Sequence, residues 1–232
     1  MPISRREFLG YAAGASAVAL GSARRSVCLF GQEPQVLSGF RVVDFGRQSL
    51  LPESAAGYER ALSRLGIEYE RISALPVRPV RGMILPAAPR MNTRDLARLR
   101  VSIENGSTVL LESGAAFLSP GDFDCFKRSI KSVFGLSLHA PIRLWDSADS
   151  FRQSPYVDYG WPFEMKVRDF SRIIPVEGVG SEEIAWFQEK PVAVRRRLGR
   201  GALVFLGSPL GPHLLADDRE SVSWLRRFFS LC

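Results

Sequence analysis

The chain has 232 residues, of which 46% are hydrophobic and 24% are charged, a balance typical of a soluble globular domain. Its formal charge of +7 comes from basic residues scattered among acidic ones, which argues against a nucleic-acid partner. Three widely separated cysteines and two histidines argue against a disulfide framework and a structural zinc site, and no pattern predicts a metal or a cofactor.

The first 25 residues resemble a twin-arginine signal peptide. The motif Ser4-Arg-Arg-Glu-Phe-Leu9 precedes an apolar stretch rich in Ala and Gly, and Ala17-Val-Ala19 fits a cleavage site. The stretch of about 15 residues is short of the roughly 20 that cross a bilayer as a helix. We therefore expect export by the Tat translocase to the periplasm or the medium, or a membrane anchor if the signal is not cleaved.

Short apolar runs alternate with amphipathic segments in the first half of the mature chain. The pattern predicts strands at 41–44, 67–72, 82–85 and 108–111, and helices at 55–65, 92–104 and 122–134. This rhythm with short loops predicts a parallel sheet covered on both faces. Cys125 lies in the last of these helices, where a buried thiol is the common outcome.

The second half of the chain does not continue this regular alternation of strands and helices. An aromatic, irregular insertion is expected near 138–165, followed by strands at 172–176, 183–188, 192–197 and 202–206 and a closing helix at 217–229. Leu198–Gly201 suits a tight hairpin. We expect one α/β domain over 39–231, a flavodoxin-like three-layer sandwich with a mostly parallel central sheet, helices on both faces and a late β-hairpin.

Two segments carry a family resemblance. Gly82–Pro86, the helix to Glu104 and the run from Asn105 to Gly114 form an apolar strand, a helix, a glycine, a second apolar strand and a sharp elbow. The segment Gly199–Gly207 closes the domain with a glycine-basic-glycine turn and a strand. This series resembles the class I glutamine amidotransferase-like superfamily, more closely its ThuA-like and β-galactosidase trimerisation-domain branches.

The resemblance also implies where chemistry is missing. Catalytic members carry a Cys on the elbow after the fourth strand and a late His-x-Glu pair. Here the elbow falls at Ser113, the glycine expected two residues earlier is Leu111, and no late His-x-Glu pair follows. The resemblance therefore implies that this chain does not hydrolyse glutamine.

A serine triad is the sharpest enzymatic hypothesis. Ser113 on the elbow is the candidate nucleophile, His213 the base and Asp217, or its neighbour Asp218, the orienting acid. The alternative is that Ser113 only turns the chain and His213 packs near the last helix.

Candidate ligand-binding residues fall into two groups. Glu112 and Asp44 end strands, where a carboxylate binds a ligand or satisfies loop amides. Tyr156, Asp158, Tyr159 and Trp161 suit stacking and hydrogen bonding to a sugar or peptide, or packing onto the sheet edge. Gly207–Gly211 either places backbone amides around an anion or forms a tight turn.

Together these features favour an exported, non-catalytic domain that binds a ligand or partner and is related to carbohydrate use. The alternative is a serine hydrolase using Ser113 and His213. A small molecule or carbohydrate is the expected ligand, and the oligomeric state stays open.

Overall fold

The computed structural model describes residues 37–44, 51–88, 91–144, 155–169 and 172–231, all within the compact unit Pro34–Cys232. The signal peptide expected at 1–25 lies outside these residues. The helices are α1 (Pro52–Arg64), α2 (Thr93–Glu104), η3 (Ala115–Phe117), α3 (Pro120–Phe134), α4 (Gly211–Leu215) and α5 (Arg219–Ser230). The strands are β1 (Leu37–Val43), β2 (Tyr69–Ile72), β3 (Val80–Ala88), β4 (Thr108–Ser113), β5 (Leu136–Leu138), β6 (Ile142–Arg143), β7 (Tyr156–Tyr159), β8 (Met165–Arg168), β9 (Arg172–Ile173), β10 (Val176–Gly178), β11 (Glu182–Phe187), β12 (Lys190–Leu198) and β13 (Gly201–Leu206).

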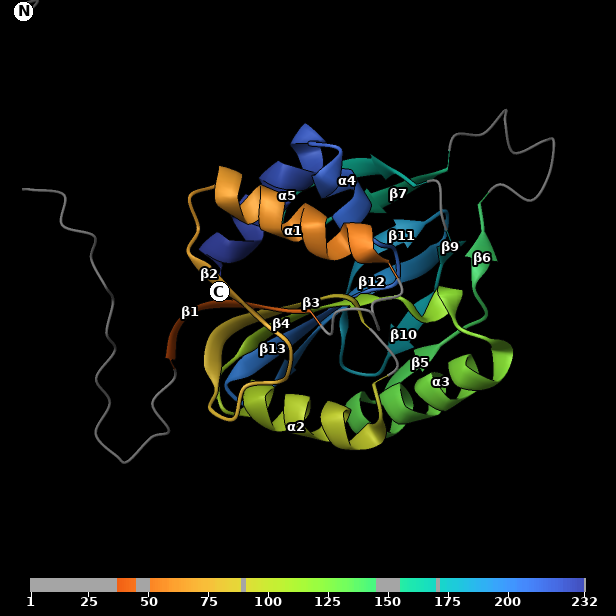
Figure 1. Cartoon of the computed structure of the whole chain (residues 1–232). Helices are drawn as coiled ribbons and strands as arrows, with labels where there is room; N and C mark the ends of the chain where they lie inside the picture. Colours follow the sequence, from red (N-terminus) through yellow and green to blue (C-terminus); the bar gives the residue numbers. More distant parts are fainter. Residues whose placement is uncertain (1–36, 45–50, 89–90, 145–154, 170–171, 232) are drawn as a thin grey trace, which may run out of the picture. The chain divides into compact units, whose positions relative to one another are not determined.

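The central sheet has nine strands in the order β2-β1-β3-β4-β13-β12-β11-β7-β8 (Figure 1). Strands β2, β1, β3, β4 and β13 are parallel to one another. From β13 onward, β12, β11, β7 and β8 pair antiparallel. Two short ladders, β5 with β10 and β6 with β9, lie outside this sheet.

The expected flavodoxin-like, mostly parallel sheet is therefore wrong. Within the described residues, four strand pairs of the central sheet are parallel and four are antiparallel. The physical reason is connection length, because strands joined by short turns pair antiparallel whereas parallel strands need a crossover. β11, β12 and β13 follow one another through tight turns, and β7 and β8 form a further hairpin.

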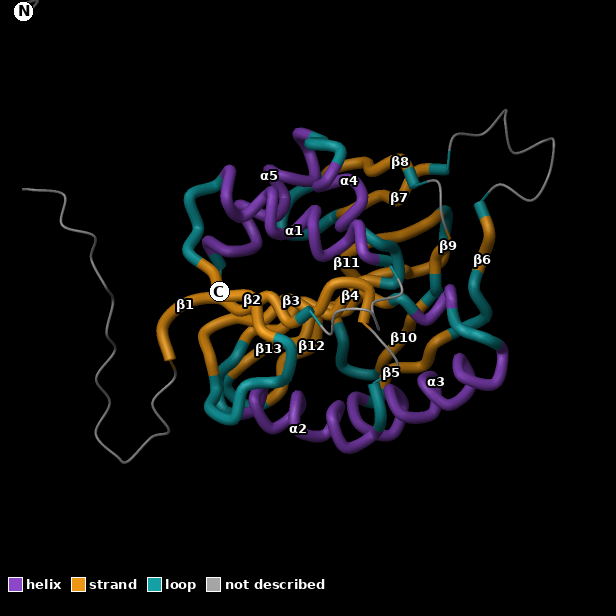
Figure 2. Tube along the Cα trace, in the orientation of Figure 1, coloured by secondary structure: helices purple, strands orange, loops and turns teal. Residues whose placement is uncertain are grey.

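Helices cover both faces of this mixed sheet (Figure 2). Side chains of Val42, Ile84, Leu110 and Val204 pack into one core with α1, α4 and α5. Val43, Met83, Leu111 and Phe205 point to the other face and pack with α2 and α3. Because side chains alternate along a strand, neighbouring residues at a strand end also face opposite layers.

The helices begin where the sequence supplies caps. Asn92, Ser119 and Asp218 each accept a backbone N–H from the first turn of α2, α3 and α5 through a side-chain oxygen. Pro120 follows its cap at the first helical position, and Gly135 ends α3 in the left-handed conformation at φ +66°. The expected helices are thus confirmed with bounds that move by a few residues.

Four local expectations need correction. β3 runs through Pro86 to Ala88 rather than ending at Leu85. The segment near 138–165, expected to be irregular, contains β6 and β7, while residues 145–154 lie outside the described part. The strand expected at 172–176 divides into β9 and β10. Cys125, expected to be buried, is exposed.

Candidate functional site

Glu112 lies at the carboxyl end of β4 and is fully buried. It points to the same face as Leu110, toward α1. Its Oε2 accepts a hydrogen bond from Ala87 N at 2.8 Å, and its Oε1 accepts one from Gly211 N at 2.7 Å. The carboxylate thus joins the end of β3 to the start of α4.

Burial raises the pKa of Glu112 above its ordinary value. Hydrogen bonds from the backbone at Gly211, Ala87 and Leu210 oppose this shift because they favour the ionised form. The backbone amides at Leu210 and Gly211 do surround an anion, as one interpretation of the Gly207–Gly211 segment anticipated, and that anion is the Glu112 side chain.

Further buried polar side chains surround this carboxylate. Tyr58 of α1 and Tyr159 of β7 both lie close enough that the Glu112 charge helps burial to raise their pKa values. Ser208, directly after β13, donates a hydrogen bond to Asp169 and also interacts with the Tyr159 hydroxyl. We call the five residues Glu112, Tyr58, Tyr159, Ser208 and Asp169 the strand-end cluster, and each is at most 3% exposed.

Ser113 points away from this cluster. The next residue after Glu112 on β4, it faces the α2 and α3 layer by strand alternation and is 1% exposed. Its Oγ accepts a hydrogen bond from Ala115 N at 3.2 Å, which turns the chain into η3. Within the described residues, no hydrogen bond connects Ser113 to His213.

His213 lies on α4, on the opposite side of the sheet from Ser113, and is half-buried. Burial lowers its pKa, while the charges of Asp169 and Asp218 act in the opposite direction. Asp217 forms an ion pair with Arg64 of α1 and does not act on the imidazole. The structure therefore does not bring Ser113, His213 and Asp217 together.

Asp44 follows β1 and forms an ion pair with Arg71 of β2, so it joins β1 to the edge strand β2. Within the described part of the chain, no group of three His, Cys, Asp or Glu side chains has the spacing to hold a metal ion.

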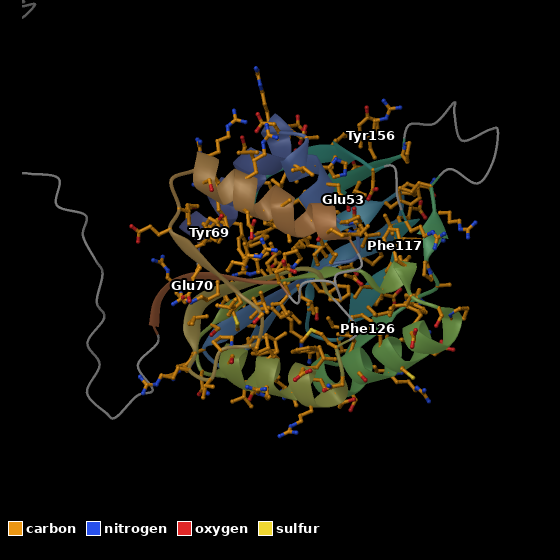
Figure 3. The ribbon with its side chains drawn as sticks, viewed as in Figure 1. Glu53, Tyr69, Glu70, Phe117, Phe126 and Tyr156 are labelled. Atoms are coloured by element: carbon orange, nitrogen blue, oxygen red, sulfur yellow. The ribbon has the colours of Figure 1, made fainter. Side chains whose placement is uncertain are left out.

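The aromatic segment packs mainly inward. Tyr159 is buried against Trp224 of α5 with ring centroids 5.7 Å apart. Trp161 contacts the Trp224 and Phe228 rings, and the Arg195 guanidinium lies 4.9 Å from its centroid. Asp158 pairs with Lys166 across the β7–β8 hairpin, and Tyr156 is exposed (Figure 3). Of the two interpretations left open, packing onto the sheet describes Tyr159 and Trp161.

Three members of the strand-end cluster were not anticipated from the sequence. Tyr58 lies in the helix expected at 55–65 but is not among the predicted site residues, Asp169 carries no motif, and Ser208 was part of the Gly207–Gly211 segment without a role of its own. Asp169, directly after β8, and Ser208, directly after β13, are joined by a hydrogen bond although these two strands are not neighbours in the sheet. The sequence features that pointed here were Glu112 at a strand end, Tyr159 in the aromatic segment and the glycine-bounded turn at Gly207–Gly211, which contains Ser208.

No family model matches the chain, and no curated protein matches it. Among solved structures, the fold is similar to parts of carbohydrate-active enzymes. The β-galactosidase from Rahnella sp. R3 aligns with a TM-score of 0.62 and 14% identity, over 83% of this chain and 32% of that chain. The exo-β-1,4-mannosidase Op5Man5 from Opitutaceae bacterium strain TAV5 gives 0.59 and 12%, over 86% and 36%.

The chain thus spans about a third of the length of these enzymes. A third likeness is to a protein of similar size, the cytoplasmic protein STM1381 from Salmonella typhimurium LT2, with a TM-score of 0.60 and 9% identity over 84% of this chain and 99% of that one. At these identities the likeness concerns the fold alone. It agrees with the correction of the fold class made above.

Proposed function

We propose that this chain is an exported carbohydrate-binding domain with no catalytic activity of its own. Its structural neighbours include a β-galactosidase, a mannosidase and an α-L-fucosidase, and the chain corresponds to about a third of each. We infer that a domain with this fold serves carbohydrate binding.

The absence of catalysis is proposed because buried side chains occupy the carboxyl ends of the parallel strands. Enzymes with open α/β sheets bind their ligands in a crevice at this edge. In the described part of this edge, the strand-end cluster occupies the ends of β4 and β13, and its carboxylates are buried and held by backbone amides and a serine hydroxyl. A glycosidase needs two carboxylates that reach a substrate, and a serine hydrolase needs a serine next to a base.

Export rests on the twin-arginine motif, and the relation to the non-amidotransferase branches of the glutamine amidotransferase-like superfamily rests on the elbow and the closing hairpin. Both remain predictions. In the described residues, no helix has the length and apolar character that a membrane crossing requires. Replacing Arg5 and Arg6 together by Lys should retain the protein in the cytoplasm if the motif directs export.

Two measurements on the purified chain test the proposal. We expect no labelling by a fluorophosphonate probe and no release of nitrophenol from nitrophenyl β-galactoside, β-mannoside or α-fucoside. We also expect heat of binding with galactose, mannose or fucose in calorimetry. Labelling that disappears in Ser113→Ala would establish the serine hydrolase instead, and absence of binding to every sugar would refute the carbohydrate function.

A further inference from the structure

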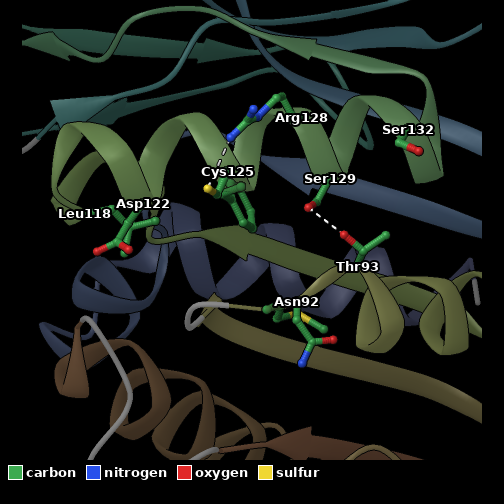
Figure 4. A pocket seen from close by; sticks show the side chains of 10 residues that line it. Asn92, Thr93, Leu118, Asp122, Cys125, Arg128, Ser129 and Ser132 are labelled. Atoms are coloured by element: carbon green, nitrogen blue, oxygen red, sulfur yellow. Dashed lines mark hydrogen bonds between the residues drawn. The ribbon is translucent and has the colours of Figure 1, made fainter.

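A groove of about 550 Å³ lies between the start of α2 and one side of α3 (Figure 4). It is on the α2–α3 face, away from the strand-end cluster. Met91 and Phe126 form a buried apolar floor, and the half-buried Leu118 closes one end. Above the floor, α3 presents Cys125, Ser129 and Ser132 at the i, i+4 and i+7 positions of one helical stripe.

Side chains around this floor offer both donors and acceptors. Thr93 Oγ1 and Ser129 Oγ are 2.9 Å apart, so one hydrogen bond crosses the groove and one hydroxyl proton stays available. Asn92 Oδ1 accepts Asp95 N at 2.9 Å, which leaves its Nδ2 as a donor. Ser132 adds a further exposed hydroxyl.

The charges of the groove are balanced. Asp122 lines one end, where it accepts the Ser119 hydroxyl at 2.8 Å. Arg128 lines the other side, and its Nη2 donates to Cys125 Sγ at 3.3 Å. Among the described residues that line the groove, one carboxylate and one guanidinium offset each other, so this lining favours a neutral ligand over an anion or a cation.

We propose that this groove binds a neutral mono- or disaccharide. The ring of a sugar has an apolar C–H face that fits the floor of Met91 and Phe126, and its hydroxyls alternate between donor and acceptor like the groove's own groups. The proposal rests on the carbohydrate function above and names the surface that performs it. The volume is within the usual range for small-molecule sites, roughly 300–1,000 Å³.

Cys125 supplies the test, because its thiol is exposed inside the groove. The rate of alkylation by N-ethylmaleimide is measured on the full chain by mass spectrometry of the Cys125 peptide, with galactose, mannose or fucose present, or with glycerol as control. At a sugar concentration ten times its Kd, the fraction of protein with an unoccupied groove falls by about tenfold, and the alkylation rate should fall by the same factor. Glycerol should leave the rate unchanged.

Ser129→Ala removes one hydroxyl that contacts the sugar and should weaken binding by about fivefold. Ser63→Ala, an exposed serine on α1, is the matched control and should bind as wild type. Thermal unfolding of both variants checks that the fold is intact. If a sugar binds in calorimetry but alkylation is unchanged, or slows equally in glycerol, the groove is refuted and the carbohydrate function stands. If no sugar binds, both are refuted.

Discussion

Removing the acceptor capacity of Glu112 is the sharpest perturbation of this fold. In Glu112→Gln, one amide oxygen can still accept a backbone N–H, but the amide nitrogen is a donor and faces the other N–H. Either Ala87 N or Gly211 N then loses its partner in a fully buried position. A buried unpaired donor costs about 1–3 kcal/mol. Glu112→Ala loses both acceptors and leaves a cavity, so we expect the free energy of unfolding to fall by about 3–5 kcal/mol.

Urea unfolding at pH 7, followed by far-UV circular dichroism, measures these changes. For a domain of this size, each kcal/mol also lowers the Tm by about 2–4 °C. Glu68→Gln is the matched control, because Glu68 is exposed in the loop before β2 and should change stability by less than about 0.5 kcal/mol. Equal unfolding midpoints for the two Gln variants would show that the carboxylate does not hold these loops.

The pH dependence of the difference between wild type and Glu112→Gln follows from the raised pKa. An acid whose folded-state pKa is raised contributes stability that is fully present below its unfolded value, here 4.5, and is lost as the pH rises through the folded value. The Gln variant lacks this titration. The advantage of wild type should therefore be larger at pH 4.5 than at pH 7, and a constant difference would contradict the raised pKa.

Three further predictions concern neighbouring elements. Gly57→Ala should destabilise the fold by about 1–3 kcal/mol, because an added Cβ would lie 1.9 Å from Gly211 O where α1 crosses α4. Gly121→Ala is the control, since its Cβ meets open space on α3 and should not destabilise the fold. Equal urea midpoints for the two variants would refute the close contact. Because the pKa of His213 is lowered in the folded state, wild type should lose stability as the pH falls from the ordinary pKa of 6.5 through the folded-state pKa. His213→Gln should remove this loss. The same change of urea midpoint between pH 7.5 and 5.5 in both proteins would refute it. Acetate should raise the unfolding midpoint of Glu112→Ala more than that of wild type, because it can occupy the freed amides, and equal shifts would refute a carboxylate-shaped space.

Local sequence predicted α1, α2, α3, α5 and most strands of this fold because periodicity and caps are local properties. Asn92 before α2 is an example, since its cap is visible within four residues. Strand direction was missed because it depends on which distant strand becomes the neighbour, and β7 and β8 are only four residues each. The exposure of Cys125 was readable from helix phase, because it sits one position off the stripe of Phe126 and Ile130 and in line with Ser129.

The candidate site was predictable only in part for the same reason. Glu112 could be placed at a strand end from the run that precedes it. That it binds amides of its own chain rather than a ligand depends on Gly211, 99 residues later, and on a turn whose neighbour is set by tertiary packing. Ser113 and His213 could be assigned to one rim, but the alternation of β4 directs Ser113 to the other face.

The antiparallel half of the sheet explains why binding is proposed on the α2–α3 face. In an open parallel sheet, the edge beyond the carboxyl ends of the strands is the usual crevice for a ligand. Here the β7–β8 hairpin contributes Tyr159 and is followed by Asp169, and both are buried against groups at the ends of β4 and β13. Among the described residues, side chains of the protein therefore occupy the ends of β4 and β13. The groove beside α3 lies on the opposite face from that hairpin, which leaves its hydroxyls and the Cys125 thiol open to a sugar.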